Sequence, residues 1–163
     1  MEDCLTFNIK IMATWFLAKI RYEKTNEKGL TKKVTEYILV DALSFTEAEA
    51  RTIENMKAYN TGEFTVTALK IENISELFTS DKECDDKFYK IKVAYITLDE
   101  KTAKERRTYS YMLVQSSDTA NAEKRLHEGM KGTMADYQVV AVQETSIVDV
   151  HPYELEPETE ETR

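Results

Sequence analysis

Apolar and polar residues alternate in two segments of the chain that resemble each other. In residues 15–22, WFLAKIRY, every second side chain from Phe16 onward is apolar, and the side chains between them include two cations. Residues 88–95, FYKIKVAY, follow the same period of two. Successive side chains of an extended strand point to opposite faces of its sheet. The pattern therefore predicts two strands, each with one apolar face.

The resemblance continues along the chain at an offset of 73 or 74 residues. Residues 37–50, YILVDALSFTEAEA, match residues 111–124, YMLVQSSDTANAEK. Residues 64–70, FTVTALK, match residues 137–143, YQVVAVQ. Each copy predicts two strands, a helix and a third strand, followed by a short apolar segment. Because the matching segments keep the same order in both copies, the sequence favours an internal duplication.

Signals for the start of a helix fall at the same place in each copy. Thr46 and Glu49 have the spacing of a capping box in the first copy, and the second helix is predicted to begin at Asp118 or Thr119. We therefore expect an α+β fold of tandem ββαβ units, with mostly antiparallel sheet backed by two helices and an approximate twofold axis. The following pairs are predicted to occupy equivalent core positions: Phe16 and Tyr89, Leu39 and Leu113, Ala48 and Ala122.

Four segments follow from this interpretation. Residues 1–11 form an extension before the repeat, residues 12–80 and 81–150 are the two ββαβ units, and residues 151–163 are an acidic tail. The tail holds five Glu against one Arg and shows no apolar periodicity, so it is predicted to be disordered.

The charge of the chain is unevenly distributed. The formal net charge is −8, and the tail contributes much of it, because cations and carboxylates nearly balance between residues 12 and 150. No global field would therefore draw the protein to DNA or to an anionic membrane, and an anion site would have to be a local patch. Two cysteines without a pattern indicate a reduced, cytoplasmic protein, and no apolar run approaches the ~20 residues of a membrane span.

The sequence lacks the recognised motifs of catalysis. It contains no phosphate-binding glycine loop, no nucleophile elbow and no zinc-protease motif. The carboxylates around Cys84, in residues 81–86, lack the ligand spacing of a calcium loop, and we interpret them as a solvated linker. We therefore predict no catalytic residue, no metal and no cofactor.

One pattern on the non-core face of the first strand of each copy suggests a binding surface. An aromatic residue is followed by two cations at alternating positions: Trp15, Lys19 and Arg21 in the first copy, Phe88, Lys90 and Lys92 in the second. Proteins that bind single-stranded nucleic acid combine stacking aromatics with a cationic groove. The alternative is that this face is solvated or covered by a partner, with the aromatics belonging to the core.

Several strings of the chain resemble a known family. They are TWFLAKIRYEK, VTEYILVDALSFTEAEARTIE, GEFTV, YKIKVAYITLDEK and EGMKGTMADY, in this order. Together they are similar to domain-of-unknown-function family 4494, which groups uncharacterised bacterial and phage proteins. The resemblance implies a phage association, and it implies no activity and no site residues.

We interpret the chain as a non-enzymatic cytosolic binding module whose partner is an unknown protein or a second copy of itself. Two alternatives stay open. One is weak, sequence-tolerant binding of single-stranded nucleic acid, and the other is a small intracellular enzyme without a recognisable motif. No membrane partner is expected.

Overall fold

The computed structural model describes residues 14–59 and 62–152. The predicted extension, residues 1–11, and the predicted tail beyond Pro152 lie outside the described residues. The elements follow in this order: β1 (Thr14–Thr25), β2 (Thr31–Ala42), α1 (Phe45–Tyr59), β3 (Phe64–Glu72), β4 (Glu76–Phe78), β5 (Lys87–Leu98), β6 (Glu105–Ser116), α2 (Thr119–Gly129), β7 (Asp136–Glu144) and β8 (Ile147–His151).

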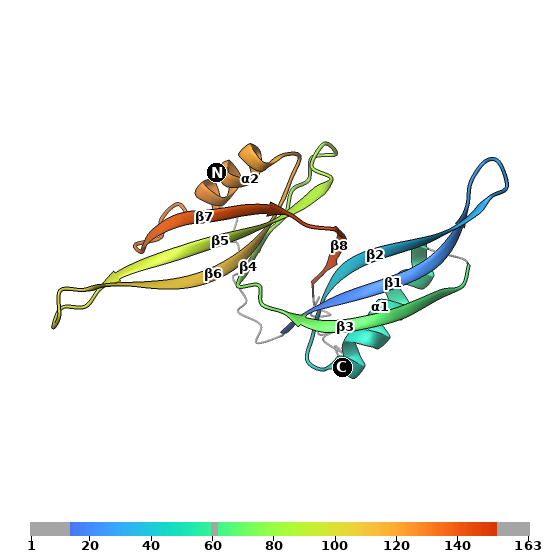
Figure 1. Cartoon of the computed structure of the whole chain (residues 1–163), viewed down its shortest axis with the longest axis horizontal. Coiled ribbons are helices and arrows are strands. Elements are labelled where there is room, and N and C mark those ends of the chain that lie inside the picture. The colour runs from blue at the N-terminus through green and yellow to red at the C-terminus, as the bar shows by residue number, and fades with distance from the viewer. Residues whose placement is uncertain (1–13, 60–61, 153–163) are drawn as a thin grey trace, which may run out of the picture.

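The strands form two mixed sheets of four strands, with the orders β3-β1-β2-β8 and β4-β6-β5-β7. In each sheet the first strand of the copy lies between the second and the third, and these three are antiparallel. The fourth strand of each sheet, β8 or β4, is parallel to its neighbour. In Figure 1 the sheets extend in opposite directions from the middle of the molecule, and the two helices lie on opposite sides. The α+β class is confirmed.

The two halves exchange their shortest strands. β4 follows β3 in the chain but pairs with β6 of the second half, in the register Leu77 to Leu113. β8 follows β7 but pairs with β2 of the first half, in the register Leu39 to Val150. Each sheet is therefore completed by the other half of the chain, so the predicted units 12–80 and 81–150 are not independent in their pairing.

The strand pairing is equivalent in the two halves. Phe16 lies opposite Val40 across β1 and β2, and Tyr89 lies opposite Val114 across β5 and β6. Each third strand also has one irregularity in its pairing, next to Lys19 in the first sheet and next to Lys92 in the second. The six residues predicted at equivalent core positions are all buried. An evolutionary duplication stays a prediction that this agreement supports.

The first helix begins earlier than its predicted cap. The N–H of Glu47 donates to Ser44 Oγ at 3.2 Å, and the N–H of Leu43 donates to Glu47 Oε2 at 3.3 Å. The capping box predicted at Thr46 and Glu49 is therefore wrong by two residues. Ser44 and Glu47 have the same spacing as Thr46 and Glu49. The helix starts at the earlier of these two pairs because β2 ends at Ala42, two residues before Ser44.

The second helix begins as predicted. Asp118 is its N-cap, and the carboxylate accepts a hydrogen bond of 2.7 Å from the N–H of Asn121. At the other end of this helix, a side chain at Gly129 would meet the ring of Phe78, with its Cβ only 2.4 Å from Cε1. The absence of a side chain at this position therefore lets the exchanged strand β4 lie close to α2.

Each helix covers one face of its own sheet, and the apolar side chains beneath it form a core. Met56 of α1 packs on Ile20 and Val40, while Leu126 of α2 packs on Ile91 and Val114. A further cluster, which we call the junction cluster, lies where the two sheets meet and consists of Leu39, Ile74, Phe88, Leu113 and Ile147. The junction cluster contains residues of both halves, so its packing connects them. Neither described helix is long and apolar enough to cross a membrane.

Candidate nucleic-acid interface

Each sheet has one face without a helix, which we call the open face. Residues paired directly across antiparallel strands point to the same face. The pairing therefore places the first predicted triplet, Trp15, Lys19 and Arg21, on the open face of β1. The same argument places the second triplet, Phe88, Lys90 and Lys92, on the open face of β5.

The two predicted aromatics do not form an exposed stacking platform. Phe88 is only 5% exposed and belongs to the junction cluster. Trp15 is half-buried and packs against the same cluster. The prediction of an exposed ring is wrong for Phe88, because both residues stand at the starts of their strands, where the two sheets meet. Any stacking on the open faces must use other rings.

Two tyrosines that the sequence interpretation missed supply such rings. The ammonium of Lys92 lies 4.3 Å from the ring centre of Tyr109, and that of Lys90 lies 4.7 Å from the ring centre of Tyr111. Tyr109 is 50% exposed, so part of its ring is available to a ligand. The signal that could have found them is the alternation within β6, where both residues fall on the open face opposite β5. Cation–π contacts hold the two lysines over these rings.

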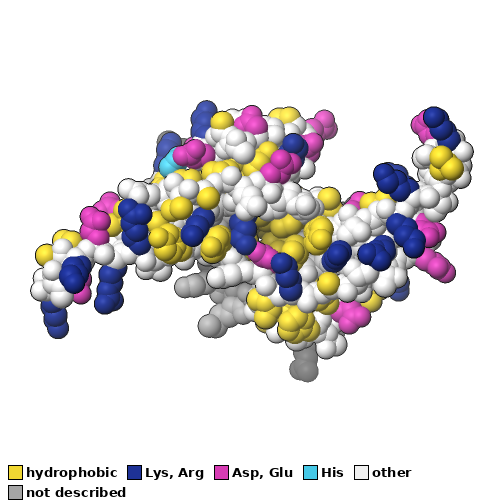
Figure 2. Space-filling model, in the orientation of Figure 1, with side chains coloured by type: hydrophobic (Ala, Val, Ile, Leu, Met, Phe, Trp, Pro, Cys, Tyr) yellow, Lys and Arg dark blue, Asp and Glu magenta, His cyan; other side chains and the backbone are white. Residues whose placement is uncertain are grey.

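The open-face cations form a row across the molecule. Figure 2 shows Lys and Arg side chains following one another over both sheets, with apolar surface between them near the middle. By the strand pairing, the central cations of this row are Lys19, Arg21, Lys70, Lys90 and Lys92. We call these five residues the basic row. Lys70, which the sequence interpretation missed, is on β3 opposite Leu17 and has a 68% exposed side chain.

One carboxylate interrupts the basic row at the junction. Glu72 accepts a short hydrogen bond from Lys90, and its second oxygen lies 3.9 Å from Lys70 Nζ. The side chains of Glu72 and Lys90 are 15% and 28% exposed, so this ion pair is largely desolvated. Because Glu72 is on β3 and Lys90 on β5, the pair links the two halves. The cost of removing one partner from such a pair exceeds that of a surface ion pair.

A cleft of about 340 Å³ opens at this point of the row. Its floor consists of apolar side chains at or beside the junction cluster, namely Leu17, Ile74, Leu113 and Ile147. Its rim is polar and comes from four separate strands and the segment between β7 and β8, with Tyr37, Lys70, Glu72, Lys90, Gln143, Glu144, Thr145 and Ser146. The cleft thus combines an apolar surface with hydrogen-bonding groups of both kinds.

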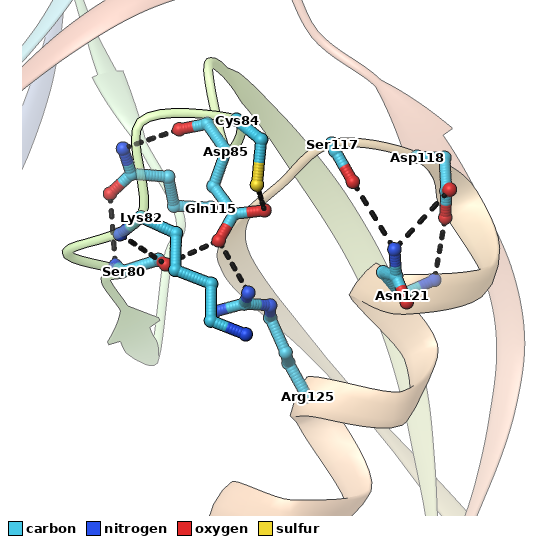
Figure 3. Close-up of polar contacts among 9 residues, drawn as sticks. All are labelled: Ser80, Lys82, Cys84, Asp85, Gln115, Ser117, Asp118, Asn121 and Arg125. Atoms are coloured by element: carbon cyan, nitrogen blue, oxygen red, sulfur yellow. Dashed lines mark hydrogen bonds and ion pairs between the residues drawn. The ribbon is translucent and has the colours of Figure 1, made fainter.

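Hydrogen bonds hold part of the acidic linker, residues 81–86, against the second half. Asp85 is 3% exposed, and its carboxylate forms short contacts with the guanidinium of Arg125 and the hydroxyl of Ser80 (Figure 3). The side-chain amide of Gln115 donates to the backbone oxygen of Asp85 at 2.9 Å. The prediction of a solvated linker is therefore wrong for Asp85, because α2 presents an arginine at this place. Among the described residues no group of three acidic, His or Cys side chains is arranged to hold a metal ion.

One titratable group with a perturbed pKa, Tyr22, lies away from the row. The hydroxyl of Tyr22 donates to Glu36 Oε1 at 2.6 Å, on the helix-covered side of the first sheet. This hydrogen bond, together with burial and the negative charge of Glu36, raises the pKa of Tyr22 to about 12. A perturbed pKa can mark a catalytic group. Here a structural hydrogen bond accounts for it, and we assign Tyr22 no chemical role.

The comparison with known proteins adds a family and no activity. A family model described as Domain of unknown function (DUF4494) matches residues 14–153. No curated protein matches the chain.

Proposed function

We propose that this chain, which belongs to the DUF4494 family of domains of unknown function, is a non-enzymatic module that binds single-stranded nucleic acid along its open faces. The observation that carries the proposal is the basic row, which runs over both sheets beside the rings of Tyr109 and Tyr111.

The chemistry of the row suits a flexible anionic polymer with aromatic side groups. Each cation neutralises a phosphate and releases its counterion, while an exposed ring stacks on a base at about 1–3 kcal/mol. A single strand can follow a row of this kind because its backbone bends, and its bases are free to turn toward Tyr109, which is half exposed. A duplex has its bases paired and would leave the rings unused.

The net charge of −8 does not contradict this proposal, because the charge is unevenly distributed along the sequence. The segment from residue 151 onward holds five Glu and one Arg. The basic row, in contrast, contains five cations and is interrupted by one carboxylate, that of Glu72. Local potential over a surface patch, not net charge, decides where a polyanion binds.

A protein partner is the competing proposal. A protein that covered the open faces would need carboxylates to compensate these cations, whereas a single-stranded nucleic acid brings a phosphate for each cation and a base for each exposed ring. The combination of cations and rings therefore favours a nucleic acid.

The test uses fluorescence anisotropy with the full chain and a labelled oligothymidylate of about 20 nucleotides, longer than the ~4–16-nucleotide sites of known single-strand-binding folds. We expect binding at about 20 mM salt that weakens steeply toward about 150 mM. Reversing two row charges, with Arg21→Glu and Lys92→Glu together, should weaken binding at least 10-fold at low salt. It should also reduce the salt slope by about 1.4, at about 0.7 for each lost phosphate contact.

The matched control reverses two charges on the helix-covered face of the first sheet. Lys24 and Lys32 are exposed and lie opposite each other across β1 and β2, at positions that alternate with the open face. The Lys24→Glu and Lys32→Glu chain has the same change in net charge and should bind within about twofold of the original protein. Equal losses in both variants would overturn the proposal. So would no binding at low salt, and capture of a protein through the open faces would then favour a protein partner.

A further inference from the structure

We infer that the cleft at the junction receives one unstacked base of the bound strand, while the basic row holds the phosphates on either side. This inference rests on the proposed function and adds a single anchoring position to it.

The position and size of the cleft fit such a role. It lies within the basic row, because Lys70 and Lys90 are both row residues and lining residues. Its volume of about 340 Å³ is at the lower end of the range for small-molecule sites, about 300–1,000 Å³. A strand that follows the row must therefore cross the mouth of the cleft.

The floor of the cleft supplies an apolar surface for the face of a base. Leu17 is half-buried, and Ile74 and Ile147 are each 8% exposed, so part of each side chain is accessible in the cleft. These side chains are fixed by the junction cluster, so the floor is formed before a ligand arrives. A preformed site avoids the entropic cost of ordering side chains on binding.

The rim supplies donors and acceptors for the edge of the base. Lys90 presents an ammonium donor, Glu72 a carboxylate acceptor, and Gln143 an amide with both functions. Bases that are splayed out of a single strand are recognised by stacking and by hydrogen bonds to their edges. Every base edge offers at least one donor or acceptor that this rim can meet, thymine included, through its N3–H and carbonyl oxygens.

The cleft is a single site although the chain contains two similar halves. The repeat alignment places Leu17 at the position of Lys90, and Glu72 at the position of Thr145. The second copy of the ion pair would join the equivalent positions, Thr145 and Leu17, and neither side chain is charged, so the pair between Glu72 and Lys90 occurs once. The hydroxyl of Thr145 instead donates to the backbone oxygen of Phe88 at 2.7 Å. We expect one inserted base per chain.

The experiment compares two labelled strands of equal length, oligothymidylate and an abasic deoxyribose-phosphate strand. Both present the same phosphates, so the ratio of their affinities isolates the bases. We expect oligothymidylate to bind about 10-fold or more tightly, consistent with ~1–3 kcal/mol for a stacked base. Ser146→Phe places a ring in the cleft from an exposed rim position, and it should reduce this ratio by about threefold or more while leaving binding of the abasic strand unchanged.

Two further variants keep the test decisive. Thr46→Phe adds a similar ring at an exposed position of α1, away from the open face, and should leave the ratio unchanged. Glu72→Gln keeps the volume of the rim but removes its charged acceptor, and should lower the ratio even if Ser146→Phe fails to fold. If Ser146→Phe and Glu72→Gln leave the ratio unchanged, the cleft inference is wrong and the proposed function stands. If the original protein binds both strands equally, both the cleft inference and the proposed stacking on Tyr109 are wrong. If neither strand binds, the proposed function itself fails.

Discussion

Leu113 provides a direct test of the junction that joins the two halves. It lies on β6, opposite Lys90 of β5 and Leu77 of the exchanged strand β4. Its side chain is fully buried in the junction cluster with residues of both sheets, Leu39 among them. Leu113→Ala removes three carbon atoms from a site whose walls belong to two sheets, so the walls cannot close independently on the space left behind.

The expected cost follows from this geometry. Buried Leu→Ala substitutions cost about 2–5 kcal/mol, and the cost grows with the cavity that remains. We expect a loss of about 3 kcal/mol in the free energy of unfolding for Leu113→Ala. With a urea dependence of about 2 kcal/mol per molar, within the range for small proteins, the midpoint of unfolding should fall by about 1.5 M.

Two probes report on different parts of the molecule during urea unfolding. Trp15 is the chain's one tryptophan and packs against the junction cluster, so its fluorescence follows the junction. Far-UV circular dichroism follows both sheets and both helices. The two transitions should coincide in the original protein and in Leu113→Ala, because strand exchange makes the halves unfold together.

The matched control is Leu98→Ala, where the same substitution falls on a side chain that is 65% exposed. It should change stability by less than about 0.5 kcal/mol. A loss below about 1 kcal/mol for Leu113→Ala, or separate transitions for the two probes in the original protein, would refute the reasoning.

Three other predictions concern single contacts. Gly129→Ala should destabilise the chain by about 1–3 kcal/mol despite the helix propensity of alanine, and Phe78→Leu in the same chain should recover part of the loss, measured by thermal unfolding. The hydrogen bond from Tyr22 contributes stability below pH 10 that is lost as the pH rises toward 12, because the pKa of the folded state is raised from 10.0 to about 12. Glu36→Gln should return the ionisation of Tyr22, followed by absorbance, toward pH 10. Arg125→Met should cost about 3–5 kcal/mol in urea unfolding, since it leaves a buried carboxylate without its cation, and a loss below about 1 kcal/mol would contradict this.

Much of the fold could be predicted from the sequence because successive side chains of a strand alternate between the two faces of its sheet. The alternation around Phe16 and Tyr89 identifies both helix-covered faces. The continuous apolar runs around Leu39 and Leu113 identify second strands that are buried on both sides. These are local patterns, and each one is confirmed by the burial of the residues that carry it.

The strand exchange could not be predicted in the same way. A segment of three residues such as β4, Glu76–Phe78, has too short a pattern to specify a partner strand. Periodicity indicates which side chains share a face, but it does not indicate which sheet the strand joins. The cleft was missed for the same reason, because its lining residues Lys70, Glu72 and Lys90 come together only through the arrangement of the two sheets.

The misinterpretation of Phe88 shows how one face can serve two purposes. Phe88, Lys90 and Lys92 share the open face of β5, but the first sheet meets this face only at the start of the strand, where Phe88 lies in the junction cluster. The face is therefore core at Phe88 and half-buried at Lys90 and Lys92. The cleft thus lies on side chains that also hold the halves together. Binding at the cleft and stability of the junction are then linked, because a ligand that binds only the folded state stabilises the contacts that form its site.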